Sequence, residues 1–432
     1  MFDRVRRVRR TARVVRTAGR MYFGYRRTQR TVRKATPAEA DAAWAARHEQ
    51  FAQDLYRLAV DLKGLYIKTG QFVGTRSDIF PEAYTRSLSR LQDRVPPQPV
   101  ARVRRTIEEG LGRPVSELFA EFTDEPLATA SLAQVHRARL ADGREVAVKV
   151  QHPEVAGLVR LDVRNLQTLV GIVARRQPNF DYRAIVNEIG TQVPLELDFV
   201  REAAMTKRVA ANLAAMPGIV IPAVIDEMVT RRVLVAEFVT GARLFGADHL
   251  ADASADGPAL AKTITAAYGQ MLLVDGLFQA DPHPGNILVL GEGRVGLLDF
   301  GLTKELPDTM RLGFARLVLA SAARDVPAIL AAFGELGVRT KSDDPEGVLG
   351  LMSVLFEPRQ TTPGGFEGTR RQALNRNPVE AIPGDLVLLG RVIGLLRGVC
   401  ASLGSPLSPM QMLRPFAEQA LAGGTSEGAA AS

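Results

Sequence analysis

The sequence predicts an α+β fold, and three observations support this prediction. Apolar residues recur at helical spacing over residues 37–115, over residues 155–215 and again beyond about residue 258. Short segments typical of strands lie between them, at residues 116–150 and 219–240. With 46% hydrophobic and 24% charged residues, the chain of 432 residues has the composition of a globular protein and not of a disordered one.

The length and composition exclude several classes of protein. The chain is long enough for two or three domains, or for one large two-lobed enzyme. A single cysteine, Cys400, excludes a disulfide framework and multi-cysteine metal sites, and five histidines leave little room for a histidine-rich one. The longest stretches without charge, residues 209–225 and 398–413, contain prolines, and residues 386–399 contain Arg391 and Arg397. We therefore expect no membrane-spanning helix.

Positive charge is concentrated at the N-terminus. Residues 1–34 hold twelve arginines and one lysine against one aspartate, a net +12, so the other residues carry −4 of the total of +8. The apolar residues of this segment recur at steps of three and four: Val5, Val8, Ala12, Val15, Gly19 and Tyr22. Three interpretations compete: a helix lying on an anionic membrane surface or lipid, a nucleic-acid-binding arm, or a solvated tail. The first is favoured. Without a secretory apolar segment, it predicts a cytoplasmic protein that is peripheral to the inner face of the membrane.

A lysine in an apolar strand is the first candidate functional residue. Lys149 stands in the segment VAVKV, the second of two strands joined by a turn at Asp142-Gly143. Such a lysine is costly unless it meets an anion, and phosphate oxygens and a glutamate are the expected partners. The alternative is a lysine that reaches water at the strand edge. Farther along, VLVAEFVTG is similar to a strand that leads into an adenine-binding hinge, which makes Glu237 and Val239 candidate nucleotide contacts.

The strongest chemical signal is an aspartate and an asparagine five positions apart, followed by Asp-Phe-Gly. Asp281 and Asn286 have the spacing of a kinase catalytic loop, and Asp299 begins the Asp-Phe-Gly after twelve further residues that read as two short strands with a Gly-Glu-Gly turn. In phosphoryl transfer, Asp281 would orient the attacking hydroxyl or accept its proton, and Asn286 and Asp299 would hold magnesium. His283 is expected to brace the loop backbone. The alternative, an Asp-Pro turn and a helix-capping aspartate, is disfavoured because other kinase elements occur in order.

A possible phosphate-covering loop precedes Lys149. The spacing of the kinase glycine-rich loop is kept, but alanines stand at the glycine positions, and their methyl groups should stiffen the loop. The candidate nucleotide contacts in this loop are Ala128, Thr129, Ala130, Ser131 and Val135.

Together these residues resemble the UbiB-type family, also called the aarF-domain-containing atypical kinases, over about residues 50–420. The family's KxGQ motif is similar to the segment from Lys68 to Gln71, and its ExD motif to the segment from Glu196 to Asp198. The resemblance implies a bilobal protein-kinase-like fold, in which an N-terminal helical extension carrying Lys68 packs over the active site. Two positions depart from the family: Gln279 replaces a common histidine, and Ala133 replaces a common glycine.

The resemblance also implies how the site is assembled. Lys149 should pair with Glu202, and Lys68 should reach the nucleotide and meet Glu196 and Asp198. Asp281, Lys149 and Lys68 would then be the catalytic residues. Gln71, Glu196, Asp198 and Glu202 would help to bind ATP or ADP with Mg²⁺.

The predicted organisation has five parts: a basic arm (1–36), a helical extension (37–115), an N-lobe (116–240), a helical C-lobe (241–421) and a disordered tail (422–432). The predicted function is a magnesium-dependent, ATP-binding kinase or ATPase that supports quinone or isoprenoid-lipid metabolism at a membrane surface, with proteins of that pathway as possible partners. A nucleotide-binding pseudokinase scaffold and a protein kinase acting in trans are the alternatives. Because the Asp-Phe-Gly is followed by a helical run near Met310 without an Ala-Pro-Glu segment, a platform for peptide substrates is not expected.

Overall fold

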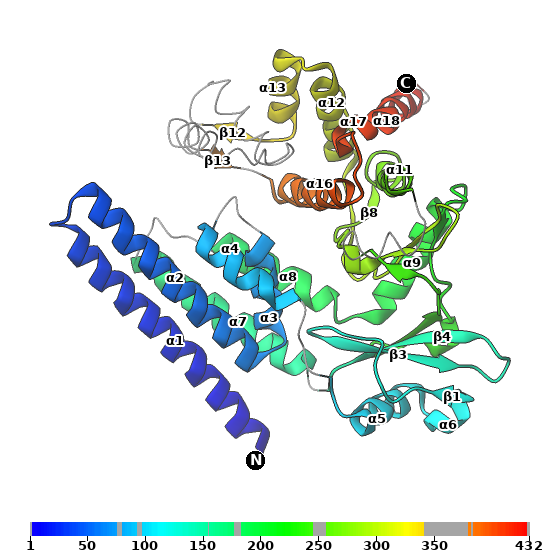
Figure 1. Cartoon of the computed structure of the whole chain (residues 1–432), viewed down its shortest axis with the longest axis horizontal. Coiled ribbons are helices and arrows are strands. Elements are labelled where there is room, and N and C mark those ends of the chain that lie inside the picture. Colours follow the sequence, from blue (N-terminus) through cyan, green and yellow to red (C-terminus); the bar gives the residue numbers. More distant parts are fainter. Residues whose placement is uncertain are drawn as a thin grey trace. The chain divides into compact units, whose positions relative to one another are not determined.

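The chain folds into two compact units, seen in a computed structural model (Figure 1). The first unit consists of Met1–Arg201 and Ile225–Phe238, and the second of Glu202–Val224 and Val239–Ser432. The structure describes residues 2–75, 80–92, 97–153, 155–176, 183–244, 256–340, 379–381 and 383–429.

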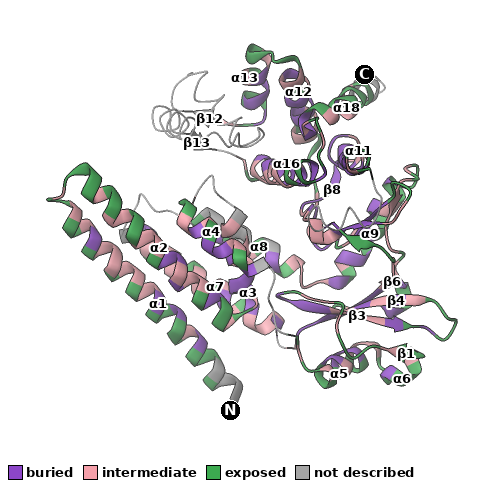
Figure 2. Cartoon of the chain, in the orientation of Figure 1, coloured by how far each residue is buried: buried purple, intermediate pink, exposed green. Residues whose placement is uncertain are grey.

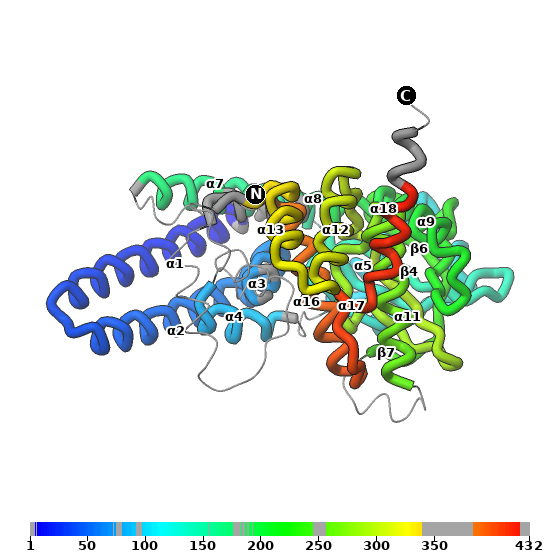
Figure 3. Tube along the Cα trace, turned by 90° about the horizontal axis from the view of Figure 1, so that it is seen from above, coloured from blue at the N-terminus to red at the C-terminus, as the bar shows by residue number. Residues whose placement is uncertain are grey.

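The first unit begins with a layer of helices. The first two helices form an antiparallel hairpin, and α7 runs along α1 (Figure 3). Thr36 begins the second helix with a capping box that it shares with Glu39, and Pro37 takes the first helical position. The helices of this layer are α1 (Phe2–Val32), α2 (Pro37–Leu62), α3 (Leu65–Thr75), α4 (Glu82–Ser89), the 3-10 turn η1 (Arg90–Gln92), α7 (Val155–Arg176) and α8 (Arg183–Leu195).

Helix α1 is part of this layer and does not stand apart as an arm. Its inner face buries Val14 and Thr17 together with Arg10, whose guanidinium meets Asp162 of α7. A charged residue can be buried here because a carboxylate of opposite charge is buried with it. The interpretation of residues 1–34 as a solvated tail is therefore wrong for α1.

The helical spacing predicted over residues 37–115 is interrupted between α2 and α3. Lys63 and Gly64 both have left-handed backbone angles, with φ of 56° and 55°, so α2 ends at Leu62 and α3 starts afresh at Leu65. Periodicity alone cannot show such a break, because the apolar spacing continues across it. Close packing of α3 then depends on Gly70, where a Cβ would lie 2.3 Å from Leu91 Cδ1.

The rest of the first unit is an antiparallel sheet covered by two short helices. Strands follow the order β1-β3-β4-β6, and β2 also pairs with β3. The predicted hairpin at Asp142-Gly143 is confirmed, with Gly143 at φ 87° between β3 and β4. The elements are α5 (Val100–Leu111), α6 (Val115–Leu118), β1 (Glu121–Phe122), β2 (Ala128–Thr129), β3 (Ala133–Arg139), β4 (Glu145–Gln151), the 3-10 turn η2 (Asp226–Met228) and β6 (Val233–Glu237).

Alternation along β4 determines which face of this sheet is buried. Val146, Val148 and Val150 pack against Val103 and Ile107 of α5. Side chains alternate along a strand, so Lys149 projects from the opposite face. The apolar core therefore lies on the α5 side, and the lysine side is left for polar partners.

The second unit combines short strands with a helical core. Its larger sheet has the order β5-β10-β9-β7, and β8 pairs separately with β11. Phe278, Phe300 and Phe314 are fully buried in one continuous core. Figure 2 marks the positions of this unit that are buried. Helix α9 (Phe199–Asn212) starts in the first unit and continues here. The elements up to the Asp-Phe-Gly are β5 (Ile219–Val220), β7 (Ala242–Arg243), α11 (Gly257–Gly269), the π-helical turn η3 (Gln270–Val274), β8 (Leu277–Gln279), the 3-10 turn η4 (Pro284–Asn286), β9 (Ile287–Val289) and β10 (Val295–Leu297).

Helices dominate after the Asp-Phe-Gly, as predicted. The chain passes through one short strand into α12 within a few residues, so no long activation segment follows Gly301. The last elements are β11 (Thr303–Glu305), α12 (Asp308–Ala323), α13 (Val326–Glu335), β12 (Arg339–Thr340), β13 (Val379–Ala381), α16 (Gly384–Ser402), α17 (Pro409–Met412) and α18 (Arg414–Ala429).

The C-terminal segment differs from the expectation of disorder. Helix α18 extends to Ala429, well past the predicted boundary at residue 421, and residues 430–432 lie outside the described residues. Alanines, which favour helix, are frequent in this stretch and help to explain the difference. None of the described helices combines the length and the apolar character that crossing a bilayer requires.

Candidate active site

The segment after β8 is held in shape by its own side chains. His283 Nδ1 accepts a hydrogen bond from the Gly285 amide at 3.1 Å, which is the bracing role predicted for it. Asn286 Nδ2 donates to the Asp281 carbonyl oxygen at 3.2 Å. The spacing between Asp281 and Asn286 thus closes a compact turn, in which the asparagine amide nitrogen is used internally and its carbonyl oxygen remains as an acceptor.

A hairpin brings the two predicted magnesium ligands to one place. Ile287 of β9 pairs with Leu297 of β10, so Asn286, just before β9, and Asp299, just after β10, flank the same end. The Leu298 amide also donates to the Asn286 carbonyl oxygen at 2.8 Å. At the opposite end of the hairpin is the predicted Gly-Glu-Gly turn. Its three residues, Gly291, Glu292 and Gly293, all have positive φ.

Gln279 supports the backbone of the Asp-Phe-Gly segment. Its side chain is fully buried and donates to the carbonyl oxygens of Leu298 and Asp299 at 2.5 and 2.6 Å. Asp299 has a left-handed backbone, φ 59°, which is unfavourable for a residue other than glycine unless the surroundings hold it. The hydrogen bond to its own carbonyl oxygen provides such support, so glutamine at this position has a clear structural role.

Tyr268 completes this buried cluster and was missed by sequence reasoning. Its hydroxyl donates to Gln279 Oε1. Burial, and secondly the negative charge of Asp281, raise the pKa of Tyr268 well above its ordinary value. The hydroxyl therefore remains protonated and available as a donor. A tyrosine in an apolar helix gives little sequence signal of this role, because it is equally typical of a core aromatic.

Asp281 forms an ion pair that the sequence did not indicate. Arg391 of α16 places its NH2 nitrogen 2.9 Å from Asp281 Oδ1, and the two side chains are 18% and 25% exposed. Sequence analysis considered Arg391 only as a charge that argues against a membrane span. A usable signal existed, because Arg391 lies in an apolar run between Leu389 and Val392, which are both fully buried.

Glu202 lies beside the glycine of the Asp-Phe-Gly. A Cβ built on Gly301 would be 3.4 Å from Glu202 Oε2 and 3.2 Å from Asp299 Oδ1. Glu202 is 3% exposed, so its carboxyl group is buried next to Asp299, the candidate metal ligand. Lys149, its predicted partner, belongs to the other unit, and that pairing stays a prediction.

In the first unit, Lys149 lies on β4 between Val135 of β3 and Leu234 of β6. Its ammonium nitrogen is 5.2 Å from the centre of the Phe199 ring, at the start of α9. This distance is that of a cation–π contact. An anionic partner of Lys149, as the sequence predicts, stays a prediction.

The alanine-rich loop is a short turn between β2 and β3. The Ala130 amide donates to the Ala133 carbonyl oxygen at 2.8 Å, and His152 Nε2 donates to the Ala130 carbonyl oxygen at 3.0 Å. Burial lowers the pKa of His152, so the ring is neutral near pH 7. Leu132, at the tip of the turn, packs with Leu65 of α3. The N-terminal extension and the loop therefore share a buried cluster in the first unit. The packing of the extension over the whole active site stays a prediction. Of the other candidate residues in the loop, Ala128 and Thr129 form β2, Ser131 is buried in the turn, and Val135 lies in β3.

The motif on α3 makes the ion pair that the resemblance implied. Lys68 Nζ lies 2.8 Å from Glu196 Oε2. Gln71 points elsewhere and donates to the Leu91 carbonyl oxygen at 3.2 Å. Asp198 caps α9, since its Oδ1 accepts from the amides of Val200 and Arg201 at 3.2 and 3.3 Å. The four polar residues thus differ in role: Lys68 and Glu196 form an ion pair, Gln71 binds a backbone carbonyl oxygen, and Asp198 caps a helix.

The candidate hinge residues fall at the boundary of the units. Glu237 ends β6 opposite Val146, and the Phe238 amide donates to the Glu145 carbonyl oxygen at 3.0 Å. Val239 is the first residue of the second unit after this strand.

The donor set near Asp299 suits magnesium better than a protein-enclosed metal. Within the described ranges, no three histidine, cysteine, aspartate or glutamate side chains come close enough to hold a metal ion. Magnesium is commonly bound through one or two carboxylates together with substrate phosphates. One carboxylate and one amide oxygen, from Asp299 and Asn286, therefore fit a magnesium ion that arrives with a nucleotide.

Comparisons with known proteins agree with these motifs. The family model described as the ABC1 atypical kinase-like domain matches residues 90–333. The chain is 31% identical to AarF domain-containing protein kinase 1 of Xenopus tropicalis, over 94% of this chain and 80% of that protein. It is also 31% identical to AarF domain-containing kinase 1 of Drosophila melanogaster, over 86% of this chain and 74% of that protein.

Among solved structures, the complex of Rv3197 with erythromycin from Mycobacterium tuberculosis has a similar fold. The TM-score is 0.57 and the sequences are 26% identical, with 86% of this chain and 97% of that chain covered.

Proposed function

Because the chain belongs to the ABC1, or AarF, family of atypical kinase-like proteins, we propose that it is a magnesium-dependent kinase or ATPase that binds ATP or ADP. The observation that carries this proposal is the hairpin of β9 and β10, which sets Asn286 and Asp299 at one end with the turn of Asp281 beside them. A carboxylate for the proton and two oxygen donors for the metal are the protein groups that phosphoryl transfer requires.

Each polar side chain at the site of the second unit would have a separate role in phosphoryl transfer. Arg391 holds Oδ1 of Asp281, which leaves Oδ2 to orient the acceptor hydroxyl and take its proton. Asn286 and Asp299 would hold magnesium through oxygen atoms, while Gln279 fixes the backbone that presents Asp299. When bound, nucleotide and magnesium supply the phosphoryl group and neutralise its charge.

Residues of the first unit would contribute to nucleotide binding. Lys149 would meet phosphate oxygens, and the backbone of the alanine-rich loop and of residues 237–239 would meet phosphate and adenine. Lys68 would reach the nucleotide while Glu196 holds its ammonium group in an ion pair. These roles follow from the family resemblance and the residue types. We further propose that the activity serves quinone or isoprenoid-lipid metabolism, as the UbiB-type motifs suggest.

The test is calorimetric titration of the full chain with ATP and with ADP, each with and without magnesium, beside Asp299→Asn. We expect magnesium-dependent binding that the substitution abolishes, because it removes the metal-binding charge but not the shape. Glu292→Gln is the matched control. It removes one negative charge at the other end of the same hairpin, and its binding should equal that of the wild type.

A folded wild-type chain that binds neither nucleotide would overturn the proposal, as would loss of binding in Glu292→Gln equal to that in Asp299→Asn.

One observation favours a second candidate, a nucleotide-binding scaffold without turnover. The ion pair with Arg391 occupies one oxygen of the candidate base before any substrate is present. Binding without measurable ATP turnover, in the presence of acceptor lipids, would support the scaffold.

A further inference from the structure

Helix α1 has two apolar-containing faces, and only one of them packs on the protein. The inner face contains Val14, which is buried against α2 and its neighbours. The outer face exposes Val8, Val15 and Phe23, with relative exposures of 62%, 53% and 72%. Exposed stretches recur along α1 (Figure 2). Val8 and Val15 belong to the apolar stripe found in the sequence, and Phe23 adjoins its last residue. The stripe therefore faces solvent, and the opposite face of the helix packs on the protein.

A row of arginines runs beside the exposed stripe. Arg9 follows Val8, Arg16 follows Val15, and Arg20 follows Gly19 at the next turn of the stripe. Because successive residues in a helix are turned by little more than a quarter of a revolution, each arginine lies along the same edge of the stripe. All three arginines are exposed. The outer face therefore combines apolar and cationic side chains in two parallel rows.

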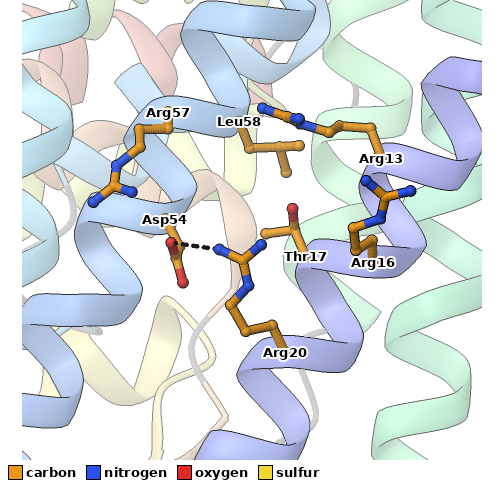
Figure 4. A pocket seen from close by; sticks show the side chains of 7 residues that line it. All are labelled: Arg13, Arg16, Thr17, Arg20, Asp54, Arg57 and Leu58. Carbon is orange, nitrogen blue, oxygen red and sulfur yellow. Dashed lines mark hydrogen bonds and ion pairs between the residues drawn. The ribbon is translucent and has the colours of Figure 1, made fainter.

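The arginine row borders a small pocket between α1 and α2 (Figure 4). Its volume is about 120 Å³. Four arginines, one carboxylate, one threonine and one leucine line it: Arg13, Arg16, Arg20 and Thr17 come from α1, and Arg57, Asp54 and Leu58 come from α2.

The pocket carries more positive charge than its own carboxylates neutralise. Arg13 pairs with Asp61, and Arg20 pairs with Asp54 at 3.3 Å. In the described part of the chain, no carboxylate lies within ion-pair distance of Arg16 or Arg57.

Asp54 gives a second indication of a ligand. Its side chain is 6% exposed, and its Oδ2 has no hydrogen-bond partner among the described residues. A buried carboxylate oxygen of this kind is costly unless it accepts a hydrogen bond. Asp54 can therefore accept from a hydroxyl on a ligand whose anionic group binds the arginines.

From these observations we propose that the outer face of α1 docks on a membrane containing anionic phospholipid, and that the pocket of Arg13, Arg16, Arg20 and Arg57 takes the phosphate of one headgroup. Val8, Val15 and Phe23 enter the interface between headgroups and acyl chains. A headgroup with hydroxyl groups, such as that of phosphatidylglycerol, also offers the donor that Asp54 lacks. The docking surface lies entirely in the first unit and does not depend on nucleotide binding.

Other occupants suit this face less well. Nucleic acid would satisfy the arginines but would leave the valines and Phe23 without an apolar partner. A second copy of the chain would bring a second arginine row close to the first, where like charges repel. An anionic lipid surface satisfies both rows at once.

Flotation of the full chain with vesicles tests this proposal. We expect binding to phosphatidylcholine vesicles that contain phosphatidylglycerol, weak binding to phosphatidylcholine alone, and loss of binding as salt is raised. The pair Arg16→Gln and Arg57→Gln should weaken binding by about 30-fold, which corresponds to about 1 kcal/mol for each basic residue near an anionic surface. The triple substitution Val8→Ser, Val15→Ser and Phe23→Ser should weaken it by at least about 30-fold.

The control for the arginine pair removes two positive charges from another helix of the first unit. Arg102 and Arg105 are exposed on α5, and changing both to glutamine should leave vesicle binding unchanged. None of these variants removes a buried contact, and the fluorescence of Trp44 verifies that the first unit is folded in each.

Three results would overturn the proposal: equal loss in the α5 control, binding to a duplex oligonucleotide but not to vesicles, or a dimer that the triple substitution dissociates. Binding of inorganic phosphate that Arg16→Gln and Arg57→Gln abolish, without any binding to vesicles, would also overturn it, because the pocket would then take free anions and not lipid.

Discussion

Two arginine–aspartate pairs, one in each unit, are built differently although both are largely shielded from solvent. In the first unit, Arg10 makes three hydrogen bonds to Asp162, at 2.7, 3.0 and 2.5 Å, and also donates to the Leu62 carbonyl oxygen at the end of α2. The side chain of Asp162 is 0% exposed. In the second unit, Arg391 makes one contact of 2.9 Å with Asp281, whose side chain is 25% exposed.

The pair of Arg10 and Asp162 is structural, whereas the pair of Arg391 and Asp281 leaves one carboxylate oxygen available for a reaction. Every charge of the Arg10 pair is used inside the protein, so that pair joins α1, α2 and α7. The Asp281 carboxylate keeps one oxygen outside its ion pair and remains partly open to solvent. We therefore expect changes in the first pair to alter stability and changes in the second to alter reactivity.

The largest effect should come from Arg10→Ala. Removing this guanidinium leaves Asp162 buried without a counter-charge, which typically costs about 3–5 kcal/mol. Urea unfolding of the first unit should shift accordingly. Trp44 is the only tryptophan and lies in α2, so its fluorescence follows this unit alone.

Two controls sharpen this result. Arg9→Ala removes an exposed arginine from the same helix and should change the free energy of unfolding by less than about 0.5 kcal/mol. Replacing both partners, with Arg10→Met and Asp162→Leu, should restore much of the loss, because no buried charge remains. If Arg10→Ala were as stable as Arg9→Ala, the pair would not be structural.

The next effect concerns Arg391→Gln. This substitution removes a charge-assisted hydrogen bond of about 1.5–3 kcal/mol from the candidate base, so ATP turnover should fall by about 10-fold to 100-fold. Nucleotide affinity should change little, because Asn286 and Asp299 are untouched. Arg397→Gln in the same helix is the control, and Asp281→Asn sets the floor of activity.

An increase in turnover in Arg391→Gln would reverse this assignment and make the ion pair an inhibitory contact. A loss of stability without a change in turnover would place Arg391 in the same structural class as Arg10.

Gln279→Leu tests the buried hydrogen-bonded cluster of Tyr268, Gln279 and the Asp299 backbone, which lies next to the candidate active site. It leaves the Tyr268 hydroxyl and the Asp299 carbonyl oxygen without their partner, at a cost of about 1–3 kcal/mol. The second unit should lose this stability. Its buried Cys400 is the only cysteine, and burial raises the pKa of the thiol, so the rate of thiol labelling in urea reports opening of this unit.

Gln279→His, the residue common in the family, should lose less, because an imidazole can still accept from the tyrosine and donate to one carbonyl oxygen. Equal losses in the two variants would mean that the cluster is held by packing alone.

What the sequence could predict depends on how local each feature is. The turn at Asp142-Gly143, the Gly-Glu-Gly turn and the loop from Asp281 to Asn286 were predicted because their geometry is set by neighbouring residues. Local fixed spacing also explains why the UbiB-type motifs were enough to identify the family.

Long-range contacts were not predictable in the same way. Arg10 and Asp162 are 152 residues apart and Arg391 and Asp281 are 110 apart, so no periodicity or spacing links either pair. The break at Lys63 was hidden for another reason: the apolar pattern continues through it, and a lysine is not a typical left-handed residue.

The smallest expected effect concerns how the stability of the first unit depends on pH. It involves His136, an uncharged side chain that is buried as completely as that of Asp162. His136 is 0% exposed. Its Nδ1 donates to the Thr123 carbonyl oxygen at 2.8 Å, and its Nε2 accepts from Gln134 Nε2 at 2.8 Å. The glutamine cannot turn round without losing the bond that its Oε1 accepts from the Gln98 amide.

Protonation of His136 would therefore place a proton against an amide N–H. Burial lowers the pKa of His136 below the ordinary 6.5 and outweighs the opposing effects of the hydrogen bond to Thr123 and of Asp124. Since the unfolded chain then binds more protons than the folded one, stability is complete above pH 6.5 and falls as the pH is lowered. His136→Asn should make this fall shallower by up to about 1.4 kcal/mol per pH unit, measured from Trp44 unfolding curves at several pH values. His48 and His152, whose pKa values burial also lowers, should keep part of the slope in the variant. A slope identical to that of the wild type would contradict this prediction, because it would mean that the folded and unfolded chains protonate His136 equally.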